Sequence, residues 1–540
     1  VLPVLPPEPG EPVDNEPAAL LQEVRDLEGL TNNKQIPEIS GGATLPFTRV
    51  TEARYGVANA GTDAETSVGM DGAGIVNPVF SGLDPRDASD LLGAQEADAA
   101  KAASANMFMM SFGQYFDHGL TFIPKGGHAP IAIGGMGVEQ MSGNPVDLNR
   151  ATATVNPKTG EIEHTNITSP VVDQNQVYGS SNLVGQLLRE SDGQGGVGPR
   201  IFSAVKDSSG KDLLPTLREL LDHHIEEGTV FTGTDKGPVT LQEYYSDTET
   251  SRVLRDEMGN YDAGFVKDLS ENFMGEGWPL LIDTNPYINL LDHYVGGDGR
   301  ANENVGLTAV HTVWARNHNY HVEQLEQAGF DGTLEELFQA ARILNIGEYQ
   351  QVVFNDFADS LLGGLQGSGR HGHDEYNPNA DGRISHEFAA AAYRFGHSQI
   401  GEMMTLKDAN GNSVDKPLFD LFLNPTNDPN AFQYVDRETG EVVLSGQAAV
   451  DALVGMDYAP QPGFAQYGVA NIIGGLLEQP SEQIDLQVVD AVRNDLVRNP
   501  ADLFAFNVAR GRDLGLGTLN QVKADLAAST DPYIEEAIEQ

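Results

Sequence analysis

The sequence contains no cysteine and is poor in basic residues. The absence of cysteine excludes disulfides, thiol catalysis and cysteine-ligated zinc or iron–sulfur centres. Lysine and arginine total 32 against 79 acidic residues, which gives a net charge of -47 and a surface that repels nucleic acid and anionic membranes. No apolar run approaches the roughly 18 residues that a membrane span requires. We therefore expect neither a nucleic-acid partner nor a membrane span.

The chain has 540 residues, of which 40% are hydrophobic, so it can bury a large core. Length alone would suggest several domains. Residues 1–20 are rich in proline and glutamate and predict an extended arm or linker. Since no repeat and no later low-complexity break follows, we expect one large domain over residues 21–540. The acidic, cysteine-free composition favours a secreted protein, although no signal peptide is visible.

The clear periodic segments are helical, whereas strand-like alternation is scarce and short. Apolar side chains recur at helical spacing from residue 307 to residue 325. Thr333 and Glu336 form a capping box that opens another helix. The alanine-rich, proline-free segment 387–397 predicts a further helix. The sequence therefore indicates a mainly α protein with long loops and little β structure.

Most of the histidines have an interpretation that involves no metal. Adjacent His223 and His224 diverge on a helix, so we expect a solvated helix end. His311, His318 and His321 lie on the apolar stripe without a glutamate at metalloprotease spacing, so core histidines bonded to backbone are favoured over a metal site.

The segment 377–388 resembles an EF-hand loop in its asparagines, aspartate and glycine. Phe388 stands where calcium needs a bidentate carboxylate, and Glu387 falls one residue short. We expect a turn at this segment and not a calcium loop.

The stretch "GQYFDHGLTF" places a glutamine and a histidine four residues apart. Gln114 and His118 would share one face of a helix, and we expect Gly119 to end that helix in a left-handed conformation. Taken alone, this pattern favours a packed core histidine over a base or an iron ligand.

Five segments in this order carry a resemblance to a known family. They are "GQYFDHGLTF", "TSPVVDQNQVYGSS", "GGDGRANENVGLTAVHTVWARNHN", "AAAYRFGHSQI" and "DLFAFNVARGRDLGLGTLN". Together they resemble the animal-type haem peroxidases of the peroxidase–cyclooxygenase superfamily, and the chain looks like a bacterial member. The resemblance extends from about Asn32 to Asn520 and implies a single, mainly helical domain around a buried b-type haem.

The resemblance assigns the haem-site residues motif by motif. His118 matches the distal histidine, Gln114 the distal glutamine and Arg300 the distal arginine. His397 matches the proximal iron ligand, and Asn507 matches the acceptor for its imidazole N–H. These types suit the chemistry, because an imidazole can shuttle a peroxide proton and a guanidinium stabilises charge on the peroxide oxygens. An acceptor behind the proximal imidazole fixes its tautomer.

Two carboxylates match the residues that form ester links to haem in mammalian members. They are Asp117 and Glu303, so covalently bound haem is one expectation and carboxylates hydrogen-bonded near the pocket are the alternative. Asn304 follows Glu303 where one mammalian member has a sulfonium-forming methionine, so that third link should be absent.

The segment after residue 168 matches the calcium loop of the family. The resemblance implies ligands from Ser169, the Val171 carbonyl, Asp173 and Asn175, which are the oxygen types that suit Ca²⁺. Many members carry an aspartate at the position of Gly119, so here Gly119 could contribute its backbone carbonyl alone.

The resemblance implies a peroxidase that reduces hydrogen peroxide and oxidises a small donor, such as a halide or a phenol, through a ferryl haem intermediate. A fatty-acid dioxygenase is an alternative, but Arg394 stands where such enzymes carry a tyrosine, and Tyr393 lies one residue further back. A manganese-oxidising peroxidase and a haem-carrying adhesion module are further alternatives. The reducing substrate and the oligomeric state are left open.

Overall fold

The computed structural model describes most of the chain. The described residues are 21, 24–54, 84–95, 101–126, 131, 133, 148–207, 209–246, 254–256, 259–362, 378–435, 442–456, 458–494, 501–530 and 534. The arm predicted for residues 1–20 lies outside them, as does Asn377, the first residue of the EF-hand-like segment.

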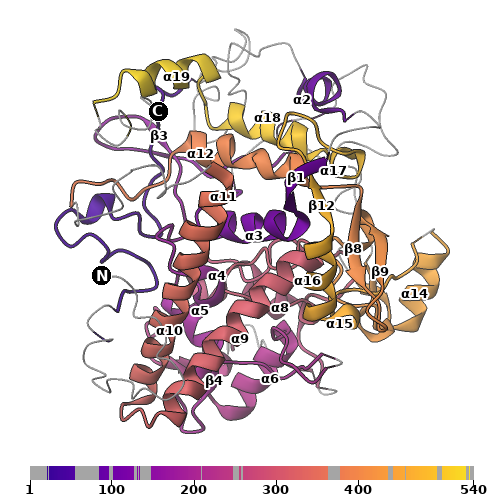
Figure 1. Ribbon diagram of the computed structural model, residues 1–540. Helices are drawn as coiled ribbons and strands as arrows, with labels where there is room; N and C mark the ends of the chain where they lie inside the picture. Colours follow the sequence, from indigo (N-terminus) through magenta and orange to yellow (C-terminus); the bar gives the residue numbers. More distant parts are fainter. Residues whose placement is uncertain are drawn as a thin grey trace.

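Helices dominate the structure, as the sequence predicts (Figure 1). The longer α-helices are α3 (Met107–His118), α6 (Leu217–Glu227), α8 (Ala263–Glu271), α9 (Val305–Gln327), α10 (Leu334–Gln351), α16 (Val469–Glu478), α18 (Leu503–Asp513) and α19 (Leu519–Ala527). The shorter ones are α2 (Pro85–Ala88), α4 (Asn175–Tyr178), α5 (Asn182–Leu187), α7 (Leu241–Tyr245), α11 (Ala358–Leu362), α12 (His386–Ala390), α13 (Leu418–Leu421), α14 (Gln447–Val454), α15 (Phe464–Tyr467) and α17 (Asp490–Asn494).

Tighter and wider helical segments join these elements. The 3₁₀ segments are η2 (Pro37–Ile39), η5 (Phe273–Gly275), η6 (Leu290–Asp292), η8 (Ala392–Gln399) and η9 (Pro429–Ala431). Two π-helical segments are η4 (Ser89–Gly93) and η7 (Val352–Phe357), and the second connects α10 to α11. Within the described ranges, every helix is too short or too polar to cross a bilayer.

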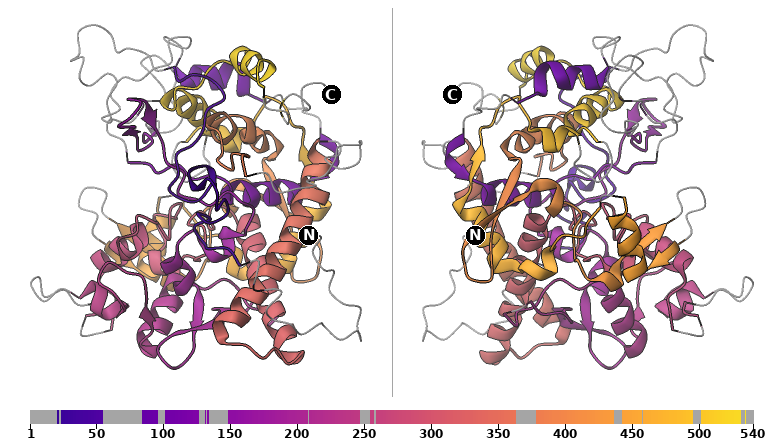
Figure 2. Two further views of the ribbon diagram at one scale, coloured as in Figure 1. Left: turned by 90° about the vertical axis from the view of Figure 1, so that its left-hand side faces the viewer. Right: turned by 90° about the vertical axis from the view of Figure 1, so that its right-hand side faces the viewer.

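The strands of the described residues pair two by two in antiparallel sheets. The pairs are β1 (Lys101–Asn106) with β12 (Pro480–Glu482), β2 (Thr154–Val155) with β3 (Ile162–Glu163), β4 (Arg189–Ser191) with β5 (Val197–Ile201), β6 (Val230–Phe231) with β7 (Val239–Thr240), β8 (Met403–Lys407) with β9 (Ser413–Pro417), and β10 (Gln433–Val435) with β11 (Val442–Ser445). The unit of β10, β11 and α14 lies at the edge of the molecule (Figure 2).

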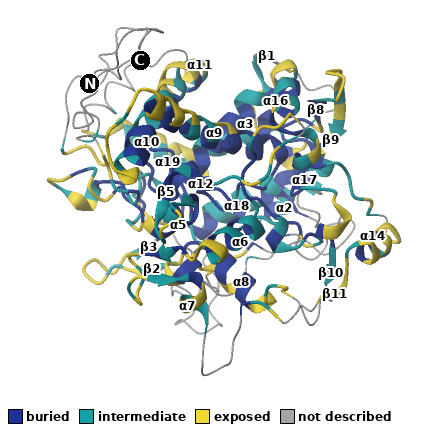
Figure 3. Cartoon of the chain, turned by 90° about the horizontal axis from the view of Figure 1, so that it is seen from below, coloured by how far each residue is buried: buried dark blue, intermediate teal, exposed yellow. Residues whose placement is uncertain are grey.

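The helix α3 lies at the centre of the largest hydrophobic cluster. It packs against α9, α16 and η8, and Met107 and Tyr115 are fully buried on it. Figure 3 shows the burial of this central region and the exposure of peripheral elements such as α14. Burying this much apolar surface contributes most of the stability of such a core. The core thereby fixes α3, which carries two of the predicted site residues, on a rigid support.

The helix α9 begins after an asparagine that caps its first turn. The side chain of Asn304 accepts a hydrogen bond from the backbone N–H of Leu307 at 2.9 Å, which satisfies one free donor of the first turn. The predicted capping box of Thr333 and Glu336 is also present at the start of α10. These caps position the loop before α9, where Arg300 and Glu303 lie.

The predicted helix over residues 387–397 is wrong as a single element. The α-helix ends at Ala390, Ala391 adopts φ -134° and ψ -65°, and the chain continues as the 3₁₀ segment η8. Tertiary contacts outweigh the helix propensity of alanine here. The Tyr393 hydroxyl donates to the Gly113 carbonyl at 3.1 Å, and the Arg394 Nε donates to the Ala389 carbonyl at 3.1 Å.

The predictions for the histidines outside the candidate site are confirmed in part. His311 and His318 are buried and lie within hydrogen-bond distance of backbone carbonyls, as predicted, whereas His321 pairs with the Glu348 carboxylate at 3.1 Å. The solvated helix end predicted for His223 and His224 is wrong.

His224 is 1% exposed, because the Leu187 carbonyl and the Thr229 hydroxyl provide buried partners for both of its ring nitrogens. His223 stacks on Phe202 and accepts a hydrogen bond from the Ser191 N–H.

Candidate active site

The helix α3 presents Gln114 and His118 on one side, as their spacing of four residues predicts. His118 is buried, with 4% of its surface exposed. Burial, reinforced by the cationic Arg300, holds the pKa of His118 well below its usual range. The imidazole is therefore neutral at physiological pH and can accept a proton.

The helix does not end at Gly119 in the predicted left-handed conformation. Gly119 has φ -76° and ψ -14°, and the chain continues the turn because the backbone N–H of Leu120 donates to the Asp117 carbonyl. Glycine is needed here for space. A Cβ at Gly119 would lie 2.3 Å from the Nε2 atom of Gln176.

The loop before α9 brings Arg300 against the end of α3. The Arg300 Nη2 atom donates to the backbone carbonyl of His118 at 3.1 Å. Two further bonds hold the guanidinium to the Asp298 carboxylate, from Nε to Oδ1 at 2.9 Å and from Nη2 to Oδ2 at 2.7 Å. The structure therefore brings together the predicted distal histidine and arginine, and adds a carboxylate that the sequence reasoning missed.

Gln114 is held in one orientation by two neighbours from the loop before α9. Its Nε2 atom donates to the Glu303 carboxylate at 2.5 Å, and its Oε1 atom accepts from the Asn304 amide at 2.7 Å. Burial and the neighbouring Asp283 carboxyl raise the pKa of Glu303 well above its usual range. The Glu303 Oε2 atom also lies 3.7 Å from the Nε2 atom of His118. Gln114, His118 and Glu303 thus line one polar site.

Asp117 is the second predicted haem-linking carboxylate. It is 8% exposed, and its Oδ1 atom has no hydrogen-bond partner among the described residues. Burial raises the pKa of Asp117, although the Arg394 and Arg300 guanidinium groups oppose that shift. A buried carboxylate oxygen without a partner is costly, which makes Asp117 a candidate to contact a bound group.

The predicted proximal residues come from η8 and α18. The Nδ1 atom of His397 lies 2.8 Å from the side-chain amide of Asn507. With the amide oxygen turned toward it, Asn507 accepts the Nδ1–H and leaves Nε2 of His397 free for a metal. Burial lowers the pKa of His397 to about 3, so this imidazole is also neutral.

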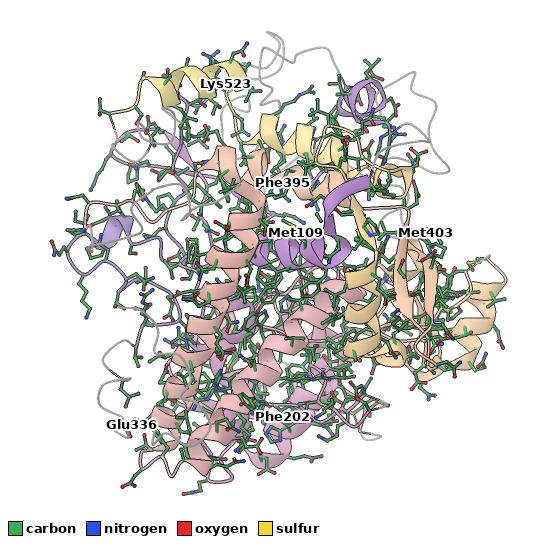
Figure 4. All side chains as sticks on the ribbon, viewed as in Figure 1. Met109, Phe202, Glu336, Phe395, Met403 and Lys523 are labelled. Carbon is green, nitrogen blue, oxygen red and sulfur yellow. The ribbon has the colours of Figure 1, made fainter. Side chains whose placement is uncertain are left out.

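The segments that carry the two predicted histidines, α3 and η8, lie next to each other. Figure 4 shows Phe395 of η8 above Met109 of α3, and these two segments are in contact. A Cβ at Gly396, next to His397, would meet no atom within 4 Å. Among the described residues, the Nε2 of His397 and the Oδ1 of Asp117 have no hydrogen-bond partner, and these atoms and the open space beside Gly396 fit a b-type haem held by His397.

The predicted calcium residues also converge. The Asn175 amide lies 2.8 Å from the Gly119 carbonyl and 2.5 Å from the Ser169 carbonyl, and the Ser169 hydroxyl donates to Asp173 at 3.1 Å. The other Asp173 oxygen is buried without a partner among the described residues, and burial raises the pKa of Asp173 to about 6. Val171 belongs to the same loop.

The backbone of this loop is strained, because Val172 and Gln174 adopt φ values of 55° and 58°. The EF-hand-like segment behaves differently: Asp381 binds Arg383 within a turn, as expected.

Comparisons with known proteins show the family of the chain and its fold. The family model "Animal haem peroxidase" matches residues 24–236 and 242–531. Peroxinectin A of Dictyostelium discoideum is 26% identical over 276 residues, 48% of this chain and 44% of that protein. Dual oxidase 1 of Caenorhabditis elegans is 32% identical over 232 residues, 42% of this chain and 14% of that protein. The matches span less than half the length of these curated relatives.

Solved structures show the same fold over nearly the whole chain. Peroxidase A from Dictyostelium discoideum superimposes with a TM-score of 0.63 at 20% identity, covering 96% of this chain and 83% of that one. A fatty acid alpha-dioxygenase from Oryza sativa superimposes with a TM-score of 0.56 at 14% identity, covering 97% and 72%. At these identities the structures show the fold alone. Because the family model covers most of the sequence, the chain belongs to the animal haem peroxidase family.

Proposed function

We propose that this chain is a haem-dependent peroxidase that reduces hydrogen peroxide and oxidises small donors such as halides or phenols. One observation carries the proposal: a neutral buried His118 and a guanidinium from a separate loop meet on one side of the site. A second neutral imidazole, His397, lies on the facing segment with its Nδ1 engaged by Asn507. Membership of the family supports the same activity.

The residues of this chain can perform the proton chemistry of peroxide cleavage. His118 accepts the proton of a bound peroxide and returns it to the departing oxygen as the O–O bond breaks. Arg300 keeps its charge and stabilises the negative charge that develops on the peroxide oxygens. Gln114 is locked by Asn304, so its amide N–H points to Glu303 in a fixed direction. Haem, when bound through His397, supplies the redox-active iron.

Peroxide-induced changes of the Soret band test this proposal. Haem-loaded protein should shift its Soret band within seconds of peroxide addition, and a halide or phenol should restore the resting spectrum. His118→Ala should retain haem and slow the shift, while His223→Gln, a substitution outside the site, should behave as the native protein. Absence of any shift in the native protein would contradict the proposal.

The dioxygenase alternative is supported by the similarity of the fold to a fatty acid alpha-dioxygenase, but by no specific contact in the candidate site. Arg394 stands three residues before His397, and the hydroxyl of Tyr393 is engaged by the Gly113 carbonyl. Oxygen uptake with a fatty acid in the absence of peroxide would favour the dioxygenase.

For the manganese alternative, the described residues contain no group of three or more histidines, aspartates or glutamates that could hold a metal ion. A panel of halides, phenols, Mn(II) and fatty acids separates these activities.

We further propose that Asp117 and Glu303 form ester links to haem. The free Oδ1 atom of Asp117 supports the first link, and the position of Glu303 beside His118 supports the second. Haem should remain with the protein after acidic solvent extraction of peroxide-treated samples. Asp117→Ala and Glu303→Gln should each remove one link, detected by mass spectrometry of haem peptides. Haem that extracts freely from the native protein would contradict this proposal.

The convergent oxygens of the loop after residue 168 support calcium binding there. We propose that Ser169, the Val171 carbonyl, Asp173, Asn175 and the Gly119 carbonyl hold Ca²⁺, with the Asn175 amide turned so that its oxygen faces the ion. A chelator should lower the melting temperature, and added Ca²⁺ should restore it. Asp173→Asn should abolish this response, whereas Asp408→Asn, in an exposed turn, should preserve it. Identical melting with chelator and with Ca²⁺ would contradict calcium binding.

Two expectations from the sequence stay predictions. They are secretion, which cell fractionation tests, and the domain boundary near residue 21, which limited proteolysis tests. The oligomeric state is open to measurement by light scattering.

A further inference from the structure

Asp298 is a buried carboxylate with a defined place in the distal site. It is 2% exposed and lies two residues before Arg300 in the loop that leads into α9. Burial opposes its ionisation, but the Arg300 guanidinium outweighs burial and lowers the pKa of Asp298 to about 2. The group is therefore a fixed negative charge at every pH at which the protein would be assayed.

The carboxylate of Asp298 accepts three hydrogen bonds from Arg300. Oδ1 accepts from both the backbone N–H and the Nε of Arg300, each at 2.9 Å, and Oδ2 accepts from Nη2 at 2.7 Å. Bidentate pairing of this kind fixes the plane and the direction of a guanidinium, which a single contact does not. The orientation of Arg300 is thus determined by Asp298.

The same carboxylate also faces His118. Its Oδ1 atom lies 3.7 Å from the Nδ1 atom of His118, which is too long for a hydrogen bond but close enough for a strong electrostatic interaction. The oriented Arg300 meanwhile binds the backbone carbonyl of His118. Asp298, Arg300 and His118 therefore form a three-residue clamp that joins the end of α3 to the loop before α9.

We propose that Asp298 is a positioning residue of the distal site, which sets the geometry of Arg300 and, through it, of His118. This inference rests on the proposed function, because it assigns to Asp298 the alignment of the two groups that act on peroxide. The haem-site residues predicted from the sequence do not include it. Its effect is exerted through its two neighbours, since its own oxygens are occupied by Arg300.

Substitution of Asp298 by asparagine tests the clamp with little change of shape. The amide oxygen can keep the bonds from the Arg300 backbone and Nε, but the amide nitrogen then faces Nη2, donor against donor. We expect haem binding to be retained and the rate constant for peroxide to fall about 10- to 100-fold. The affinity of the ferric protein for cyanide, read from its Soret shift, should fall as well. Asp298→Ala should produce the larger losses.

The matched control is Asp292→Asn in η6. Asp292 binds Arg218 with the same bidentate geometry, at 3.1 and 3.0 Å, but outside the site. Peroxide and cyanide reactions of this variant should equal those of the native protein. Equal losses in Asp292→Asn and Asp298→Asn would show a general effect of breaking an ion pair and would overturn the proposal.

A double-substitution cycle with Arg300→Ala separates positioning from a purely structural role. If Asp298 acts through Arg300, adding Asp298→Asn to the Arg300→Ala variant should lower the rate constant for peroxide by less than a further factor of two. In Arg300→Ala alone, Asp298 is a buried charge without its partner, which could unfold the protein. The double variant removes this charge. Fully additive losses would overturn the inference. A native protein that binds cyanide but does not react with peroxide would contradict the proposed function and not this inference. The cyanide affinities of the variants would still test the clamp.

Discussion

The two sides of the site are built in different ways. On the distal side, Arg300 and His118 are joined by Asp298 and backbone bonds that connect α3 with the loop before α9. On the proximal side, His397 lies on the short 3₁₀ segment η8, and its described side-chain partner is Asn507 of α18. The distal side therefore depends on several connected residues. When one of them is removed, the remaining contacts still hold α3 and the loop together. The proximal side depends on one imidazole and one amide.

The largest expected effect breaks the proximal side. His397→Ala removes the candidate iron ligand, so we expect the purified protein to lose its Soret band or to show a displaced one. His118→Ala should keep the band and slow the peroxide reaction about 10²- to 10⁴-fold, because it removes the proton acceptor. Haem content and stopped-flow spectra measure both. Equal loss of haem in the two variants would contradict the roles assigned to the two sides.

A smaller effect is expected from the single proximal partner. Asn507→Leu keeps the volume but leaves the Nδ1–H of His397 without an acceptor, so the imidazole becomes a weaker and less oriented ligand. In protein that has not been treated with peroxide, we expect haem to dissociate about 10- to 100-fold faster, measured by transfer to apomyoglobin. Gln114→Leu, the comparable loss on the networked distal side, should leave haem dissociation unchanged. A similar acceleration in both would remove the distinction between the two sides.

The third prediction concerns the packing behind the distal histidine. Gly119→Asp restores the carboxylate that many family members carry, but its Cβ would lie 2.3 Å from Nε2 and 2.7 Å from Cδ of Gln176. We expect a loss of about 1–3 kcal/mol of stability, measured by urea unfolding. The double variant Gly119→Asp/Gln176→Ala should lose less than the sum of the single variants, because the collision is removed. Additive losses would show that Gln176 is not the obstacle.

The smallest predicted effect is a pH dependence located on the proximal side. His164 and His386 lie 3.1 Å apart, and burial lowers the pKa of His164 to about 2 and that of His386 to about 3. The unfolded chain, with a histidine pKa of about 6.5, binds more protons than the folded one below that value. The stability present above pH 6.5 is therefore lost progressively as the pH falls toward 3.

His386 opens α12, which leads into η8, so its protonation should destabilise the segment that carries His397. His386→Gln can still donate to the Thr48 carbonyl and should flatten the decline of the melting temperature between pH 7 and pH 5. An unchanged slope would show that other buried histidines dominate.

The fold could be predicted because it rests on ordered sequence motifs, and the same motifs predict the candidate haem-site residues. His118 and Gln114 share a helical face, and the capping box of α10 follows a local rule. Asp298 was missed although it stands two residues before Arg300, in a turn where such a pair can close on itself. The interruption at Ala391, the burial of His224 and the conformation of Gly119 could not be predicted. The first two depend on partners distant in the sequence, Gly113 and Leu187 respectively. Gly119 instead continues the turn through the local bond from Leu120 to Asp117.

The bond between the Tyr393 hydroxyl and the Gly113 carbonyl connects the two sides directly. Gly113 lies on α3 one residue before Gln114, and Tyr393 lies on η8 four residues before His397. This tyrosine acts as a spacer of fixed length between the helix that carries His118 and the segment that carries His397. A movement of one segment is therefore transmitted to the other through this side chain, which helps to set the distance between the two walls of the candidate site.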